Sequence, residues 1–213
     1  NKEQFLTTVE TNSEPKRKFL VRLIEEDEKK QGAEDEHKAA ELLNQITNRL
    51  QKIVDHIYEN IDEMVEEYNK DSSYKTKEEF RNPIKRMKSN FKPQNISESA
   101  KQNKYTSYSI NKGEKLVFCL RAKKGTPKLT DINTMMFVAI HELAHLQSKS
   151  IGHNKEFWNN MRFILKIGIK LCVYCHTEYH KKHKAYCGIE ITGTPLEMPP
   201  DHQCSSTCGH HKK

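Results

Sequence analysis

The chain has 213 residues, of which 35% are hydrophobic and 31% are charged, with a formal net charge of +7. This length suits one packed domain with an extension better than two full domains, and the high charge predicts a small core with a large solvated helical surface. The longest uninterrupted apolar run, Met135 to Ile140, falls far short of the ~20 residues that a membrane-spanning helix needs, so we expect a soluble chain.

The charge is divided unevenly along the chain. Residues 1–70 hold 11 basic and 17 acidic side chains, whereas residues 71–213 hold 25 and 12. A basic half can attract nucleic acid or an acidic partner through its long-range field, but a solvated lysine-rich surface is the commoner cause of such a bias. Nucleic-acid binding is therefore an alternative and not the first expectation, because no reader motif accompanies the charge.

The first 75 residues predict a helical N-terminal extension. Residues 1–15 are polar and predict a loose tail, and a short helix is expected from Lys16, with Phe19, Leu20, Leu23 and Ile24 on one face. Ala33 to Tyr68 predicts one long amphipathic helix. Its apolar stripe consists of Leu43, Ile46, Leu50, Ile53, Ile57, Ile61, Met64 and Tyr68. The stripe is expected to pack on the rest of the chain or, alternatively, to bind a partner helix or a second copy as a coiled coil.

Residues 76–196 predict a compact domain that begins with a helix and a hairpin. Thr76 and Glu79 have the spacing of a capping box, which predicts a helix that runs to Phe91. A loop over residues 92–104 follows. Two strand-like segments, 105–110 and 115–121, are separated by the turn-forming residues Asn111, Lys112 and Gly113, which predicts a β-hairpin.

Two further helices are predicted after this hairpin. Thr130 or Asp131 can cap the first, which should end near Ser150. Gly152 is free to adopt the positive φ that turns the chain back, and Asn154 can cap the second helix. A short strand is expected over residues 186–192, and residues 197–213 predict a tail that contains cysteine and histidine.

The first of these two helices contains the pentapeptide His141-Glu142-Leu143-Ala144-His145, which has the form H-E-x-x-H. Residues four apart lie on one face of a helix, so both imidazoles can bind one metal ion, and Glu142 lies close enough to act as general base on an activated water. Zinc is the predicted ion, because imidazole ligands with an open fourth position suit this redox-inert Lewis acid. Peptide hydrolysis is the reaction that this chemistry favours.

The third metal ligand has three candidates. His153 is ranked first, because Gly152 lets the backbone return that imidazole towards the helix. Glu156 and His176 are the second and third candidates.

Cysteines and tyrosines supply further candidates. Cys119 is isolated and five cysteines lie between Cys172 and Cys208, which indicates reduced thiols and an intracellular setting. The alternatives are disulfides, or a second zinc ion bound by Cys172, Cys175, Cys204 and Cys208, with Cys187 as a competing ligand. Three tyrosines near the predicted site could stabilise an oxyanion, although packing is the commoner role: Tyr174, Tyr179 and Tyr186.

The H-E-L-A-H motif followed by G-H-N-x-x-F-W resembles the WLM family of zinc metallopeptidases, which are relatives of the SprT-like proteases. The resemblance covers roughly Thr106 to Leu196, and it includes the segments TSYSINKGEKLVFCLR, LTDINTMMFVAIHELAH and YCGIEITGTPL. These segments are similar to a subgroup found in large DNA viruses and some microbial eukaryotes. The spacer of seven residues between His145 and His153 is longer than in better-known members.

The resemblance implies an α+β fold with a minimal zincin-like catalytic domain over residues 76–196. It implies the ligands His141, His145 and His153 and the general base Glu142. It also implies that the strand 115–121 borders the substrate cleft, where an edge strand could bind an extended peptide by β-augmentation. The cleft residues of that strand would be Leu116, Val117, Phe118, Cys119 and Leu120.

Three functions follow as expectations. The first is a zinc metallopeptidase that acts on a protein or peptide substrate. The second is an interaction protein with a structural or vestigial metal and a helical arm. The third is a DNA-associated protease, because studied members of the resembled family act on proteins crosslinked to DNA and the catalytic half is basic. We expect a cytoplasmic or nuclear protein, with association with a virion as a further alternative.

Overall fold

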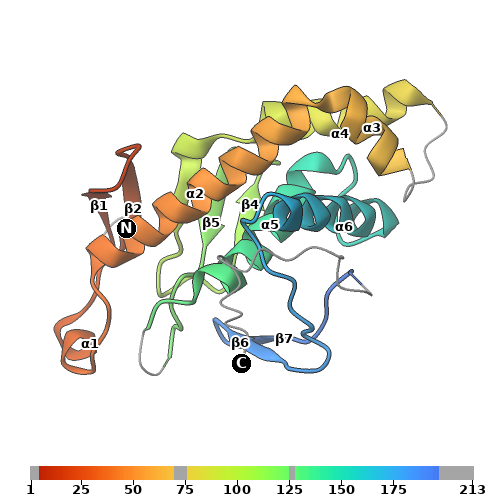
Figure 1. The fold of residues 1–213 in the computed structure, drawn as a ribbon. Helices are drawn as coiled ribbons and strands as arrows, with labels where there is room; N and C mark the ends of the chain where they lie inside the picture. The colour runs from red at the N-terminus through yellow and green to blue at the C-terminus, as the bar shows by residue number, and fades with distance from the viewer. Residues whose placement is uncertain (1–4, 70–75, 125–127, 197–213) are drawn as a thin grey trace, which may run out of the picture.

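The computed structural model describes residues 5–69, 76–124 and 128–196. Three helices and a small sheet pack around the buried helix α5 (Ile132–Gln147), and two β-hairpins flank this body (Figure 1). The helices of the described ranges are α1 (Glu26–Lys30), α2 (Glu36–Glu59), α3 (Ile61–Asn69), α4 (Lys77–Asn90), α5 (Ile132–Gln147) and α6 (Lys155–Lys170). The strands are β1 (Leu6–Glu10), β2 (Lys18–Arg22), β3 (Ile96–Glu98), β4 (Tyr108–Ile110), β5 (Lys115–Phe118), β6 (Lys184–Tyr186) and β7 (Ile189–Ile191). The α+β class expected from the sequence is confirmed.

The central sheet has the strand order β3-β5-β4. Strand β5 pairs parallel with β3 and antiparallel with β4, and the β4–β5 hairpin turns at Asn111, Lys112 and Gly113, all of which have positive φ. Such a turn matches the twist of the paired strands, and it confirms the hairpin predicted from these residues. Strands β1 and β2 form one antiparallel hairpin, and β6 and β7 form another.

One hydrophobic core joins residues from nearly every element. Helix α2 runs diagonally across the molecule and packs against α4, α5, α6 and the strands β2 and β3 (Figure 1). Its predicted stripe is buried within the chain, since Leu43, Leu50 and Ile57 have no exposed surface. The stripe therefore packs intramolecularly, which was the first of the two alternatives. The predicted N-terminal extension, residues 1–75, and the predicted compact domain, residues 76–196, both contribute residues to this core.

The N-terminal segment differs from the prediction of a loose tail and a short helix. Residues 6–22 form the β1–β2 hairpin instead, with Val9 opposite Phe19. Phe19 and Val21 are buried whereas Leu20 is 46% exposed, so the burial alternates with the period of a strand. Adjacent apolar residues at 19 and 20 fit both a helical and a strand period, and only the partner strand β1 decides between them.

Two smaller corrections concern α2 and β3. The predicted long helix is divided at Asn60, which has non-helical backbone angles and caps α2, so that α3 begins at Ile61. Residues 96–98, predicted as loop, form β3 because Ile96 and Glu98 become buried beside β5. The predicted tail over residues 197–213 lies outside the described residues. Among the helices that are described, none has the length and apolar character that crossing a membrane requires.

A buried ionic cluster attaches the N-terminal hairpin to the central sheet. Glu98 and Arg121 are 2% and 1% exposed, and the Arg121 guanidinium donates two hydrogen bonds of 2.9 Å to the two oxygens of the Glu98 carboxylate. The same carboxylate accepts a bond of 2.7 Å from the backbone N–H of Arg22 on β2. The Arg22 guanidinium is also buried, and it pairs with Glu28 on α1. The position of β2 therefore depends on Glu98.

We predict that Glu98→Gln lowers the free energy of unfolding by about 3–5 kcal/mol, because the substitution leaves the Arg121 charge buried without its carboxylate. Urea denaturation followed by circular dichroism measures this difference. The matched control is Glu10→Gln, since Glu10 pairs with Lys18 at 3.7 Å on the surface, where both side chains are more than half exposed. The control should lose less than ~1 kcal/mol, and equal losses in the two variants would contradict the assignment.

Candidate metal centre

Helix α5 holds two of the three histidines of the candidate site. Asp131 caps the helix, and its carboxylate accepts a hydrogen bond of 2.9 Å from the N–H of Thr134, as the sequence predicted. His141 and His145 are one turn apart, so their rings lie on the same face, with centroids separated by 5.0 Å. Most of the other side chains of α5 are buried, and the imidazoles lie on a side of the helix that opens to a cleft.

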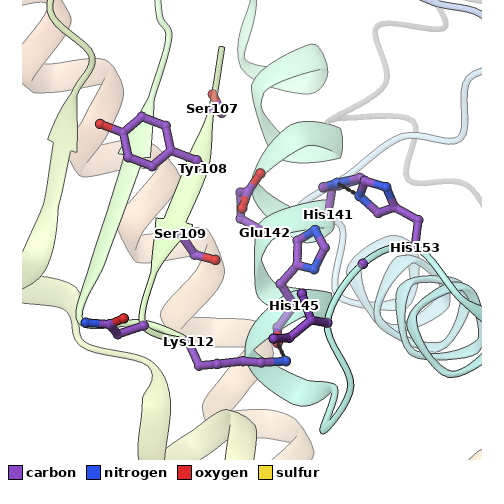
Figure 2. Close-up of a pocket in the computed structure, with 11 residues that line it drawn as sticks. Ser107, Tyr108, Ser109, Lys112, His141, Glu142, His145 and His153 are labelled. Atoms are coloured by element: carbon purple, nitrogen blue, oxygen red, sulfur yellow. Dashed lines mark hydrogen bonds between the residues drawn. The ribbon is translucent and has the colours of Figure 1, made fainter. Parts of the chain in front are cut away.

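His153 reaches the same place from the loop after α5. The chain reverses at Gly152, whose φ of +86° favours glycine, and the His153 Nε2 atom lies 3.0 Å from Nε2 of His141. One nitrogen from each of the three rings can be chosen so that all lie within 4.8 Å of one another. Figure 2 shows the three side chains pointing towards one another between α5 and the following loop. These residues therefore form a candidate metal-binding triad, as the sequence predicted.

Phe157 on α6 forms an aromatic wall behind the triad. Its ring centroid lies 4.8, 4.4 and 4.7 Å from those of His141, His145 and His153. Asn154 caps α6 by accepting a hydrogen bond of 3.1 Å from the N–H of Phe157. The cap places Phe157 in the first turn of α6, four residues after His153. The packing restricts the orientations of the three imidazoles.

Burial sets the protonation of the groups on α5. It lowers the pKa of His141 to about 3 and, with the neighbouring histidine charges, favours the neutral ring. Burial and the nearby His153 and Lys112 lower the pKa of His145 to about 4. Both rings are therefore neutral at pH 7, and a neutral imidazole is the form that binds a metal ion.

Glu142 lies beside the triad and is only 4% exposed. Burial raises the pKa of its carboxyl group to about 8, because the charged form is poorly solvated there. A cation held by the imidazoles would favour the carboxylate form of Glu142. The site thus combines three candidate nitrogen ligands with a carboxyl group that is suited to proton transfer.

A cleft of about 440 Å³ opens in front of these groups. Ser107, strand β4 with Ser109, and the following turn with Lys112 form one wall, and α5 and the His153 loop form the other (Figure 2). A smaller cavity of about 150 Å³ adjoins it, with apolar walls from α5 and the β6–β7 hairpin. His141 and Glu142 line both spaces.

The strand beside the cleft differs from the prediction. Strand β5, expected to be the edge strand, is the central strand and is hydrogen-bonded on both sides. The five predicted cleft residues are buried and do not line the cleft: Leu116, Val117, Phe118, Cys119 and Leu120. The pairing of β5 with β3 explains the error, because β3 was not predicted. The edge strand beside the cleft is β4, and the available signal was the alternation of Ser109 on this strand with Ser107 just before it.

Glu156 and His176, the two alternative candidates for the third ligand, do not join His141 and His145. The Glu156 carboxylate accepts hydrogen bonds of 2.7 and 3.0 Å from the backbone N–H groups of Lys149 and Ser150, so it holds the loop that precedes His153. His176 does not belong to the cluster of candidate ligands found among the described residues.

The tyrosine candidates also differ in position. Tyr174 and Tyr179 are buried and pack on Phe137. Tyr186 lines the smaller cavity, where its hydroxyl donates to the carbonyl of Cys119 at 2.8 Å and lies 2.6 Å from the Ser107 hydroxyl. Burial raises the pKa of the Tyr186 hydroxyl.

The cysteine prediction is corrected at Cys119. This residue forms a disulfide with Cys187, at a sequence separation of 68 residues and a Cα–Cα distance of 6.3 Å. The bond links the end of β5 to the β6–β7 hairpin that walls the smaller cavity. Cys172 and Cys175 are disulfide-bonded as well, so the prediction of reduced thiols is wrong for these residues. Cys204 and Cys208 lie outside the described residues. The intracellular setting stays a prediction without that support.

Comparison with known proteins identifies viral relatives. No family model matches the chain, and no solved structure matches it. Uncharacterized protein R325 of Acanthamoeba polyphaga mimivirus is 35% identical over 162 residues, which cover 76% of this chain and 75% of the relative. Uncharacterized protein 136R of Invertebrate iridescent virus 6 is 32% identical over 82 residues, which cover 38% of this chain and 44% of the relative. The chain belongs to the family of viral proteins that includes mimivirus protein R325.

Proposed function

We propose that this chain is a zinc-dependent metallopeptidase with a zincin-like catalytic domain. The observation that carries the proposal is the convergence of three imidazoles on one point, with the Glu142 carboxyl group beside them on the wall of a cleft. The neutral state of His141 and His145 supports a metal that prefers nitrogen ligands, and three histidines with an open side facing the cleft suit catalytic zinc. When bound, zinc would polarise a carbonyl group and activate water for attack on it.

The residues of the chain have distinct roles in this proposal. His141, His145 and His153 hold the ion. Glu142 accepts the proton of the attacking water and delivers it to the leaving amine, which is general acid–base chemistry by one carboxyl group. Its burial limits competing solvation of the carboxyl group by bulk water.

Strand β4 is the natural binding place for an extended substrate. It lies at the edge of the central sheet and borders the cleft, so a polypeptide could add to it as a further strand. Main-chain hydrogen bonds of this kind bind a polypeptide regardless of its sequence. A carbonyl of that polypeptide would then lie between β4 and α5, where Glu142 and the triad face the cleft (Figure 2).

We predict that the purified protein contains about one zinc ion per chain and that His153→Ala removes most of it, because two imidazoles bind zinc far more weakly than three. Mass spectrometry of the metal content measures this. The matched control is His183→Ala, since the His183 side chain is 48% exposed and pairs with Glu190 on the β6–β7 hairpin. Full zinc content in His153→Ala, or an equal loss in the control, would refute the assignment of the third ligand.

We predict that Glu142→Gln reduces the hydrolysis of an unfolded protein substrate by roughly 10²–10⁴-fold while the zinc content is retained, because glutamine cannot accept the proton. Release of peptides from casein measures the activity. Glu190→Gln is the control, because that side chain is 61% exposed, and it should keep full activity. Equal activity in Glu142→Gln and the wild type would exclude the general base.

A zinc-loaded protein with no hydrolysis under any condition, whose melting temperature falls on chelation, would instead favour a structural metal in an interaction protein.

A further inference from the structure

The C-terminal end of α5 is bonded by side chains from outside the helix. The last carbonyl groups of a helix have no partner within it. Here the Asn90 amide donates to the carbonyl of Leu146 at 3.3 Å, and the Arg86 guanidinium donates to the carbonyl of Gln147 at 2.7 Å. Both side chains come from α4. The end of the helix that carries His145 is therefore fixed to a neighbouring helix.

Lys112, in the β4–β5 turn, extends this bonding into the loop after α5. Its Nζ atom donates to the carbonyls of Ser148 at 2.7 Å, His145 at 3.4 Å and Ser150 at 2.5 Å. An ammonium group has three donors, and each of the three has an acceptor here. Figure 2 shows the Lys112 side chain passing beneath His145 towards this loop. The positive charge also suits the negative end of the helix dipole.

The β4–β5 turn packs closely on the end of α4, and this brings Lys112 within reach of the loop after α5. Gly113 has a φ of +112°, and a Cβ atom there would collide with the carbonyl oxygen of Asn90 at the end of α4. Glycine at this position therefore lets the turn pack directly on α4. Lys112 is the neighbouring residue, and its own φ is +55°.

Glu156 holds the same loop from the opposite side. Its carboxylate accepts the N–H groups of Lys149 and Ser150, and the Ser150 hydroxyl as well. Glu156 lies in the first turn of α6, where a negative charge is favourable. Its charge and that of Lys112 also attract each other. Residues 148–150 are thus bonded through their carbonyls by a cation and through their N–H groups by an anion.

Only Ile151 and Gly152 separate this bonded segment from His153. Ile151 is 91% exposed, and no side chain lies within 4 Å of a Cβ atom built on Gly152. These two residues have few restraints of their own. On its other side His153 is joined to Asn154, which caps α6 and whose amide donates to the Ser150 hydroxyl at 2.7 Å. Ser150 is therefore the point at which the loop before His153 and the start of α6 are bonded together. His141 and His145, in contrast, are fixed by the helix itself.

We propose that Lys112 and Glu156 are positioning residues that fix the third ligand of the metal site. Their short hydrogen bonds go to the backbone of residues 148–150, whereas the bond from Lys112 to the carbonyl of His145 is the longest of its three, at 3.4 Å. Neither side chain is a ligand of the ion. The inference rests on the metal site of the proposed function, but not on hydrolysis. Removal of a residue that orients a metal ligand without binding the metal typically lowers metal affinity by roughly ten- to a hundredfold. We expect a loss in the same range when Lys112 is replaced.

The test is a double-mutant cycle on zinc affinity in the full chain. Lys112→Met keeps the length of the side chain and removes its charge and donors. Its zinc affinity, measured by competition with a chromophoric chelator, should fall roughly ten- to a hundredfold. In a His153→Ala background the same substitution should leave the affinity unchanged, because the ligand that it positions is absent. Lys182→Met, at an exposed position, controls for the loss of one positive charge.

Each outcome decides the proposal. An equal loss of zinc affinity in both backgrounds would mean that Lys112 supports α5 as a whole. No loss of zinc affinity in either background would mean that the loop holds His153 without Lys112. Either result would overturn the inference. Glu156→Gln is the second variant, for the case in which Lys112→Met does not fold, and it should show the same dependence on His153. A wild-type chain that binds no zinc would overturn this inference together with the metal site. A chain that binds zinc but hydrolyses nothing would refute the peptidase alone.

Discussion

The burial of α5 is the constraint on which the rest of the structure depends. This helix carries two half-buried imidazoles and a buried carboxyl group, and burial of such polar groups without a partner costs free energy. The neighbouring elements cover the apolar sides of the helix and leave the histidines facing the cleft. An ion at the triad would compensate the burial of His141 and His145. The same burial keeps these rings neutral, which prepares them for that ion.

The N-terminal residues belong to this arrangement and do not form a separate arm. Helix α2 supplies much of the surface on which α5 packs, and the Glu98 carboxylate joins β2 to the sheet that forms the other wall of the cleft. The charge division between the two parts of the sequence therefore lies within one folded body. Part of it is used in contacts between them, since Lys88, from the basic part, forms an ion pair of 2.6 Å with Asp55 in the acidic part.

The sequence predicted those features whose determinants lie close together along the chain. Asp131 and Asn154 each cap the helix that follows them, and Asn111 to Gly113 form the predicted turn. His153 was predicted because a glycine precedes it. The errors arose where the deciding partner is distant: Phe19 and Val21 belong to a strand because β1 pairs with them, and β5 is central because of β3. The Cys119–Cys187 bond spans 68 residues and was missed for the same reason.

The third ligand shows why a metal motif is incomplete without its fold. The pair His141 and His145 needs only a helix, because the helical repeat sets their spacing. His153 follows after a spacer of seven residues, and a flexible spacer of that length would lose conformational entropy each time the ion was bound. Bonds to residues 148–150 shorten the free part of the spacer to Ile151 and Gly152, so most of that entropy is lost on folding. The proposed positioning role of Lys112 and Glu156 therefore rests on two residues that are distant from each other in sequence and bond the same three-residue segment.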